Sequence, residues 1–323
     1  MKKSQWWILA VVVVLIGIYF LARSRQPIEK EIRFFRADSA SVAEIKLFTQ
    51  DDTLVVKKIG NAWKMTYPLT WDVNQQQLTS FFQKVLPAKT SATPMSEDPK
   101  LQSMYKVDSL SSNQVSFLDK NGKILDHVYI GNGTNTAFIY GRRQGENQIY
   151  QFKEDIINLV TPDVMQWRSP NIINLKQSQI KSIEVRYPQN TYTLTFSADS
   201  TKYSDARESF IIPASNRAQY KIINALENLM TWQFIDTGTE KYANDFKHPA
   251  CTIRVNLNNG QTVTLTLAEH KQAAKQTADK NSFPEQPLIL LKLNDQSAPL
   301  YQMTADFLNR FTRDAAHFKT EYE

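Results

Sequence analysis

The sequence predicts an α+β protein in which an N-terminal transmembrane helix precedes two tandem repeats. Each repeat is expected to contain a β-meander, a helix and a β-hairpin, with mainly antiparallel sheets. The first observation is a pair of similar segments, residues 114–131 (QVSFLDKNGKILDHVYIG) and 252–269 (TIRVNLNNGQTVTLTLAE). In both, alternating apolar and polar residues flank an Asn-Gly dipeptide, which is the pattern of a β-hairpin. The second observation is an uncharged, apolar stretch at residues 6–22.

That apolar stretch predicts a membrane anchor over residues 1–25. As a helix it would span about 26 Å, close to the roughly 30 Å hydrocarbon core of a bilayer. Aromatic residues near its two ends suit the membrane interfaces. The anchor residues are Trp6, Trp7, Ile8, Leu15, Tyr19 and Phe20. A cleaved signal peptide is the alternative, because Lys2 and Lys3 precede the run, but the run is long for one and Phe20 would occupy the −3 position of a cleavage after Ala22.

The charge distribution also points to a membrane protein. The formal net charge of the chain is +6, and residues 1–36 account for +5 of it. A nucleic-acid partner is not predicted, because binding phosphates requires a clustered cationic surface. We expect a single-pass protein of the cell inner membrane with its C-terminal body outside the cytoplasm, in the periplasm. Arg23 and Arg25 offset Lys2 and Lys3, so the positive-inside rule alone does not decide this orientation.

The first repeat is predicted over residues 42–170, after a charged stalk at residues 26–41. Strands are expected in SVAEIKLF, DTLVVKKI and NAWKMTYP, followed by a helix that Asp72 caps and that ends before Pro87. The hairpin comes next, with Asn121-Gly122 expected to form a type I′ turn that has positive φ at both residues. Two further strands, at 137–141 and 148–152, and a helix beginning near Lys153 complete the repeat.

The second repeat, residues 171–323, is expected to have the same order of elements. Strands are predicted at 180–187, 191–196 and 209–212, and Ser215 is expected to cap the following helix. The apolar stripe of that helix is assigned to Tyr220, Ile223, Leu226 and Met230. From Asn121 to Asn259 the offset between repeats is 138 residues, and a polar, Pro-containing insertion after the second hairpin increases it to 151.

Several of these segments resemble a known bacterial family. The segments are NAWKMTYPLTWDVNQQQLTSFFQKVL, MYKVDSL, VSFLDKNGKILDHVYIG, FIYGRR and NQIYQF. They look like the domain of unknown function found in membrane-anchored proteins encoded beside gliding-motility-type ABC transporters. The chain departs from that pattern at Lys106, where the family's Tyr-Gly-Leu-like loop has a glycine. The resemblance implies an extracytoplasmic auxiliary subunit of an ABC-type exporter, and it implies no catalytic residues.

The residues do not suggest an enzyme, a cofactor or a metal site. The four histidines are scattered without the i, i+4 spacing of a helix-borne zinc site. The single cysteine, Cys251, excludes an intramolecular disulfide and is expected to be buried. The glycines after the first hairpin lack the third glycine and the helix of a dinucleotide-binding loop. The sequence therefore predicts a binding protein.

Four residues are the candidates for contact with a partner. Trp71 and Trp232 flank the predicted helices and are candidates for an exposed aromatic patch. Asp119 and His127 interrupt the apolar face that the first hairpin otherwise shares with the second. A partly buried structural role is the favoured reading for His127. The expected partner is a protein such as an ABC transporter component, and the alternative is a module that binds glycan or lipid of the cell envelope.

Overall fold

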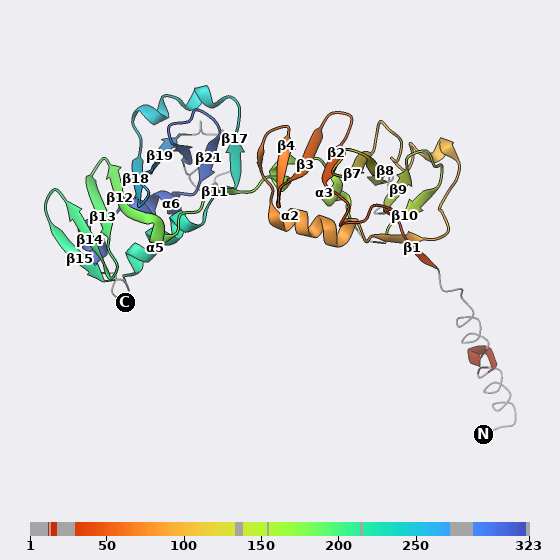
Figure 1. Ribbon diagram of the computed structural model, residues 1–323, viewed down its shortest axis with the longest axis horizontal. Coiled ribbons are helices and arrows are strands. Elements are labelled where there is room, and N and C mark those ends of the chain that lie inside the picture. The colour runs from red at the N-terminus through yellow and green to blue at the C-terminus, as the bar shows by residue number, and fades with distance from the viewer. Residues whose placement is uncertain are drawn as a thin grey trace, which may run out of the picture. The chain divides into compact units, whose positions relative to one another are not determined.

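The structure is a computed structural model that describes residues 12, 14–17, 30–132, 138–153, 155–213, 216–271 and 287–320. The chain forms two compact units, residues 1–169 and 170–323 (Figure 1). Both are α+β, and all paired strands among the described residues run antiparallel. The predicted α+β class with mainly antiparallel sheets is confirmed for these two units.

The first unit contains an eight-stranded sheet in the order β10-β9-β8-β7-β2-β3-β4-β5. Its strands are β2 (Glu44–Phe48), β3 (Thr53–Ile59), β4 (Ala62–Tyr67), β5 (Trp71–Asp72), β7 (Asn113–Leu118), β8 (Ile124–Asn132), β9 (Ile139–Arg143) and β10 (Ile149–Gln151). Its helices are α2 (Gln75–Ser80), the π-helical turn η1 (Phe81–Val85), the 3-10 turn η2 (Pro99–Leu101), α3 (Ile157–Val160) and α4 (Val164–Trp167). A pair of short strands, β1 (Glu31–Arg33) and β6 (Lys89–Ser91), lies apart from this sheet.

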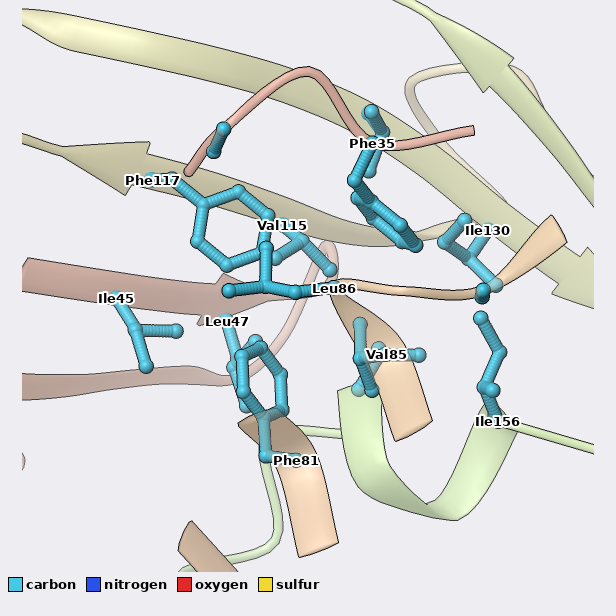
Figure 2. Close-up of a cluster of buried hydrophobic side chains, with 14 of the residues drawn as sticks. Phe35, Ile45, Leu47, Phe81, Val85, Leu86, Val115, Phe117, Ile130 and Ile156 are labelled. Atoms are coloured by element: carbon cyan, nitrogen blue, oxygen red, sulfur yellow. The ribbon is translucent and has the colours of Figure 1, made fainter. Parts of the chain in front are cut away.

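The core of the first unit lies between one face of the sheet and the α2–η1 helix. Alternate residues of β2 and β7 point to this face, as the two-residue period of a strand requires. Figure 2 shows them meeting the helix, with the labelled side chains of Phe35, Ile45, Leu47, Phe81, Val85, Leu86, Val115, Phe117, Ile130 and Ile156. Residues 31–37, which were predicted to lie in the stalk, belong to this unit, because β1 pairs with β6 and both Phe34 and Phe35 are buried.

The start of the first helix differs from the prediction. Asp72 lies in β5, where it pairs with Lys64 of β4 in the strand register and as an ion pair. The helix is instead capped by Asn74, whose side-chain oxygen accepts hydrogen bonds from the backbone N–H groups of Gln76 and Gln77 at 3.1 and 3.4 Å. Both residue types are good N-caps, so strand pairing decides between them.

The turn of the first hairpin also differs from the predicted type I′. Only Gly122 has a positive φ, of 82°. The backbone N–H of Gly122 donates to Asp119 O, and the N–H of Asp119 donates to Lys123 O, which is a type I turn followed by a G1 bulge. The Asp119 carboxylate accepts hydrogen bonds from the N–H groups of Asn121 and Lys123, and these bonds hold the turn. The second hairpin has the same arrangement around Gly260.

The second unit contains a nine-stranded sheet in the order β15-β14-β13-β12-β18-β19-β20-β21-β17. Its strands are β12 (Ile180–Tyr187), β13 (Asn190–Phe196), β14 (Ser200–Asp205), β15 (Ser209–Pro213), β17 (Gln233–Ile235), β18 (Cys251–Leu257), β19 (Thr262–His270), β20 (Leu288–Leu293) and β21 (Leu300–Met303). Apart from it, β11 (Asn171–Ile173) pairs with β16 (Leu229–Met230). Except for β17, the strands follow one another across the sheet in the same succession as in the first unit.

The helices of the second unit include α5 (Arg217–Glu227), α6 (Ala305–Phe311) and α7 (Ala315–Thr320), with 3-10 turns η3 (Gln177–Gln179), η4 (Thr239–Tyr242) and η5 (Asp245–Lys247). The N-cap of α5 is Asn216, whose side chain accepts from the N–H of Gln219, whereas the predicted cap Ser215 lies outside the described residues. Ile223 and Leu226 are buried as predicted. Tyr220 and Met230 are exposed, because Tyr220 lies off the buried face and α5 ends before Met230.

The turn after β14 supplies a testable pH dependence. Burial acts to raise the pKa of the Asp205 carboxyl, but hydrogen bonds from the backbone N–H groups of Arg207 and Glu208 and from the Tyr203 hydroxyl lower that pKa to about 2. An unfolded aspartate has a pKa of about 3.9. The ionised Asp205 carboxylate therefore stabilises the folded state fully above about pH 4, and this contribution to the unfolding free energy is lost as the pH falls toward 2.

We therefore expect Asp205→Asn to reduce the dependence of the unfolding free energy on pH between about pH 4 and 2. The asparagine oxygen still accepts the two backbone hydrogen bonds but does not titrate. Urea denaturation of the full chain at several pH values measures this slope. If the slope of unfolding free energy against pH is the same in the variant, Asp205 does not contribute to the pH dependence of stability.

Candidate functional site

The second unit has a hollow of about 380 Å³ where α5 ends and α6 begins. The segment after α5 supplies Leu229, Met230 and Trp232 to its wall. Met303 at the end of β21 and Phe307 in α6 also line the hollow. A hollow of this size and apolar character is within the range of sites that bind ligands or side chains of other proteins.

The local backbone explains why Trp232 faces outward. After α5 the chain becomes extended in β16, so successive side chains point to opposite sides. Leu229 and Thr231 are buried, and Thr231 Oγ1 lies 2.7 Å from Gln233 O and 2.9 Å from Gln302 O. Met230 and Trp232 consequently share the outer side, with exposed fractions of 53% and 71%.

A second hollow, of about 280 Å³, adjoins the first on the helical face of this unit. Both hollows are lined by Asn224 of α5 and Arg310 of α6, and we call the two together the α5–α6 groove. The second hollow has a cationic wall, to which Lys221, Arg310 and Arg313 contribute. Asp306 also lines it and accepts two hydrogen bonds from the Arg310 guanidinium, at 3.0 and 2.7 Å. The groove thus joins an apolar end to a cationic end.

Trp71, the other tryptophan predicted to contact a partner, packs against residues of the first unit. Its indole N–H donates to Ser169 O at 3.1 Å. The Arg168 guanidinium lies 4.1 Å from the centre of its ring. Trp71 therefore packs within its own unit and is only partly exposed. Of the two tryptophans predicted to contact a partner, Trp232 is the more exposed.

His127 and Asp119 lie on the first hairpin but do not form a joint site. His127 Nδ1 is 2.8 Å from Ser116 Oγ, and its ring packs beside Phe48 and Tyr129. Burial lowers the pKa of His127, which favours the neutral imidazole. The Asp119 carboxylate accepts the two backbone hydrogen bonds of the turn described above. These surroundings are those of structural residues.

The predicted membrane anchor falls almost entirely outside the described residues. Trp6, Trp7, Ile8, Tyr19 and Phe20 are among those not described, and Leu15 lies in a short helical stretch with its side chain exposed. Within the described part of the chain, no helix combines the length and apolar character needed to cross a membrane. The same residues contain no group of three or more His, Cys, Asp or Glu side chains placed to hold a metal ion.

A family model described as a domain of unknown function, DUF4340, matches residues 63–249, more than half of the chain. The chain belongs to this family. In this DUF4340 protein the match begins in β4 and ends just before β18, so it includes α5, β16 and Trp232. No curated protein and no solved structure matches the chain.

The backbone of Lys106, where the resemblance predicts a glycine, is described by the structure of this DUF4340 protein. Lys106 has a φ of 52°, a conformation that favours glycine. Its carbonyl oxygen lies against β8, at 2.0 Å from where a Cβ on Gly131 would be. Lys106 therefore adopts a left-handed conformation at some conformational cost, and Gly131 makes the close approach of this loop to β8 feasible.

The α5–α6 groove was not predicted from the sequence. Its walls come from segments about 80 residues apart in the chain, and the pairing of α5 with α6 is a tertiary contact. The sequence of residues 229–232 (LMTW) contains no local signal for it, because the exposed Met230 and Trp232 are as apolar as the buried Leu229.

Proposed function

We propose that this DUF4340 protein is a non-enzymatic subunit that binds a partner protein through the α5–α6 groove. The observation that carries the proposal is Trp232, which is 71% exposed beside an apolar hollow of about 380 Å³. Exposing a tryptophan and a neighbouring methionine to water is unfavourable unless a partner covers them. Tryptophan is also among the residues that contribute most to binding energy at protein interfaces.

The identity and location of the partner are proposed from the sequence. The apolar run at residues 6–22 supports a single-pass anchor in the inner membrane with the two units in the periplasm. The resemblance to proteins encoded beside gliding-motility-type ABC transporters supports a component of an ABC-type transport system as the partner. We also propose that the two units are tandem repeats, which their common strand succession and the 138-residue offset of the hairpins support.

A cell-envelope glycan or lipid is the second candidate ligand. Trp232 lies near polar groups of Asn228 and Gln302 at the wall of the hollow. An exposed ring beside amide side chains is able to stack on a sugar and hydrogen-bond its hydroxyl groups. The protein partner is favoured because apolar side chains form most of that wall.

Crosslinking of the full chain in intact membranes, followed by identification of the captured species, tests the proposal. We expect a transporter component to be captured, with the yield reduced about tenfold in Trp232→Ala, since loss of a central interface tryptophan costs about 1.4 kcal/mol or more. Ile211→Ala is the matched control, because Ile211 is exposed on β15 outside the groove, and its yield should be unchanged. Capture of glycan or lipid without a transporter component would contradict the proposal.

A further inference from the structure

We propose that a basic ribbon of the first unit docks on anionic phospholipid headgroups at the membrane surface. The basic ribbon consists of residues 30–33, which include β1, and residues 84–91, which include β6. The proposal rests on the part of the proposed function that places an anchor at residues 6–22, and it adds the surface of the first unit that contacts the membrane.

The pairing of β1 with β6 gives the ribbon an inner and an outer side. Ile32 packs against the core of the first unit, and Thr90 is fully buried. Neighbouring side chains along each strand point the other way, as the two-residue period of a strand requires. Arg33 and Lys89 therefore lie on the outer side, and both residues are exposed.

The outer side brings like charges together. Arg33 and Lys89 are directly opposite each other in the strand register, and like charges at such positions destabilise a strand pair. The Glu31 carboxylate lies 3.6 Å from Lys89 Nζ, but it also lies 2.7 Å from Lys153 Nζ. One carboxylate thus serves two lysines, and Arg33 forms no ion pair with any residue that the structure describes. A bound anion would relieve this repulsion.

The ribbon contains further positive charge that no carboxylate offsets. Lys30 precedes β1 and Lys84 lies in η1, and both are exposed without an ion pair in the described part of the chain. The Arg33 guanidinium donates to Leu86 O at 2.9 Å and to Ala37 O at 2.7 Å. These acceptors are neutral, so they orient the guanidinium without cancelling its charge. Its remaining N–H groups suit a phosphate.

The place of the ribbon in the chain favours a membrane as the source of that phosphate. The apolar run ends at residue 22, and residues 23–30 span at most about 28 Å when fully extended. An anchor at residues 6–22 would therefore hold the ribbon close to the headgroups, where a high effective concentration makes weak contacts sufficient. Clusters of Lys and Arg beside a membrane span bind anionic lipids in this way. No part of the chain would hold a soluble acidic protein at this place.

The test follows a fluorophore beside the ribbon in the full chain, reconstituted in lipid nanodiscs. Thr93 is exposed and follows Ala92, whose backbone N–H donates to Lys30 O at 2.7 Å, so Thr93→Cys places the label there. The natural Cys251 is buried and is not labelled. Lipids with a nitroxide on the headgroup quench the label at short range. We expect quenching at least about threefold stronger with phosphatidylglycerol than with phosphatidylcholine alone, and weaker quenching at high salt.

Two double variants locate the effect. Lys30→Glu/Lys84→Glu should reduce the quenching with phosphatidylglycerol to the level seen with phosphatidylcholine alone, because the ribbon then repels the headgroups. The matched control, Lys58→Glu/Lys100→Glu, makes the same charge change at exposed lysines of the first unit outside the ribbon and should have little effect. None of the four lysine side chains forms an ion pair within the described residues. Circular dichroism verifies that both double variants are folded.

Three results would overturn the proposal. The first is equal quenching in the two lipid compositions, and the second is an equal effect of the two double variants. The third comes from a photoreactive residue at position 93 in intact membranes. Capture of a protein that is lost in Lys30→Glu/Lys84→Glu, without lipid-dependent quenching, would assign the ribbon to an acidic protein surface.

Failure of lipid docking and failure of the proposed function are distinguishable. Carbonate extraction of intact membranes tests the anchor, and release of the full chain would remove the basis for docking. Capture of a partner that depends on Trp232 tests the α5–α6 groove by itself. If this capture is observed while phosphatidylglycerol has no effect on quenching, the groove still binds a partner and the lipid docking is wrong.

Discussion

Replacing Gly131 with alanine is expected to lower the unfolding free energy of the first unit by about 3 kcal/mol. The new Cβ would lie 2.0 Å from the carbonyl oxygen of Lys106 and 2.7 Å from its carbonyl carbon. Neither atom moves freely, because the next residue, Val107, accepts a hydrogen bond at 2.9 Å from the buried Arg142 side chain. The loop or β8 must therefore shift. Urea denaturation of the full chain measures the loss.

Gly145→Ala is the matched control for this prediction. Gly145 has a φ of 80°, and no neighbouring atom lies within 4 Å of the place that an added Cβ would occupy, so alanine there costs only the backbone conformation, about 1 kcal/mol. The larger loss of unfolding free energy at Gly131 would come only from the close approach of the Lys106 carbonyl group to this residue. Equal losses at the two positions would show that the loop yields easily and that Gly131 is not required for packing.

Replacing Arg143 with methionine is expected to cost about 3 kcal/mol. The side chain of Arg143 is only 8% exposed, and its guanidinium donates to Phe34 O at 3.0 and 2.6 Å. It also lies 4.7 Å from the centre of the Phe34 ring. Methionine fills similar space but leaves the Phe34 carbonyl without these donors. The residues around Phe34 should then detach more readily from the first unit, which amide hydrogen exchange would detect together with the loss in unfolding free energy.

Arg36 offers a control that shares a partner with Arg143. Both arginines form an ion pair with Glu146, but the Arg36 side chain is 62% exposed. Arg36→Met should change stability by no more than about 0.5 kcal/mol, as is usual for surface ion pairs. Similar losses in the two variants would mean that the ion pair with Glu146, and not the buried hydrogen bonds to Phe34, dominates.

The strands that could be predicted are those in which apolar, buried residues alternate clearly with polar, exposed ones. In β12 the residues Ile183, Val185 and Tyr187 are buried at every second position, and the predicted and observed bounds agree. In the same sheet, β14 was missed because its sequence, STKYSD, is mostly polar. Only Thr201 and Tyr203 of this strand are buried, so its existence depends on pairing with β13 and β15.

Local details depended on competing hydrogen bonds that hydropathy does not reveal. The Asp119 carboxylate binds two backbone N–H groups and thereby favours a type I turn with a bulge at Gly122, although an Asn-Gly dipeptide by itself favours type I′. The candidate site was harder to predict from the sequence than these local details. Trp232 was identified as a possible contact, but the hollow beside it exists only because α5 lies next to α6.

Site-specific photocrosslinking from position 232 tests most directly whether the α5–α6 groove binds a partner protein. A photoreactive residue replaces Trp232 in the full chain, and a second variant carries it at Ile211, which is exposed on β15. In intact membranes we predict one defined protein crosslinked from position 232 and none from position 211. Equal capture from both positions, or capture of only glycan or lipid from position 232, would contradict the account.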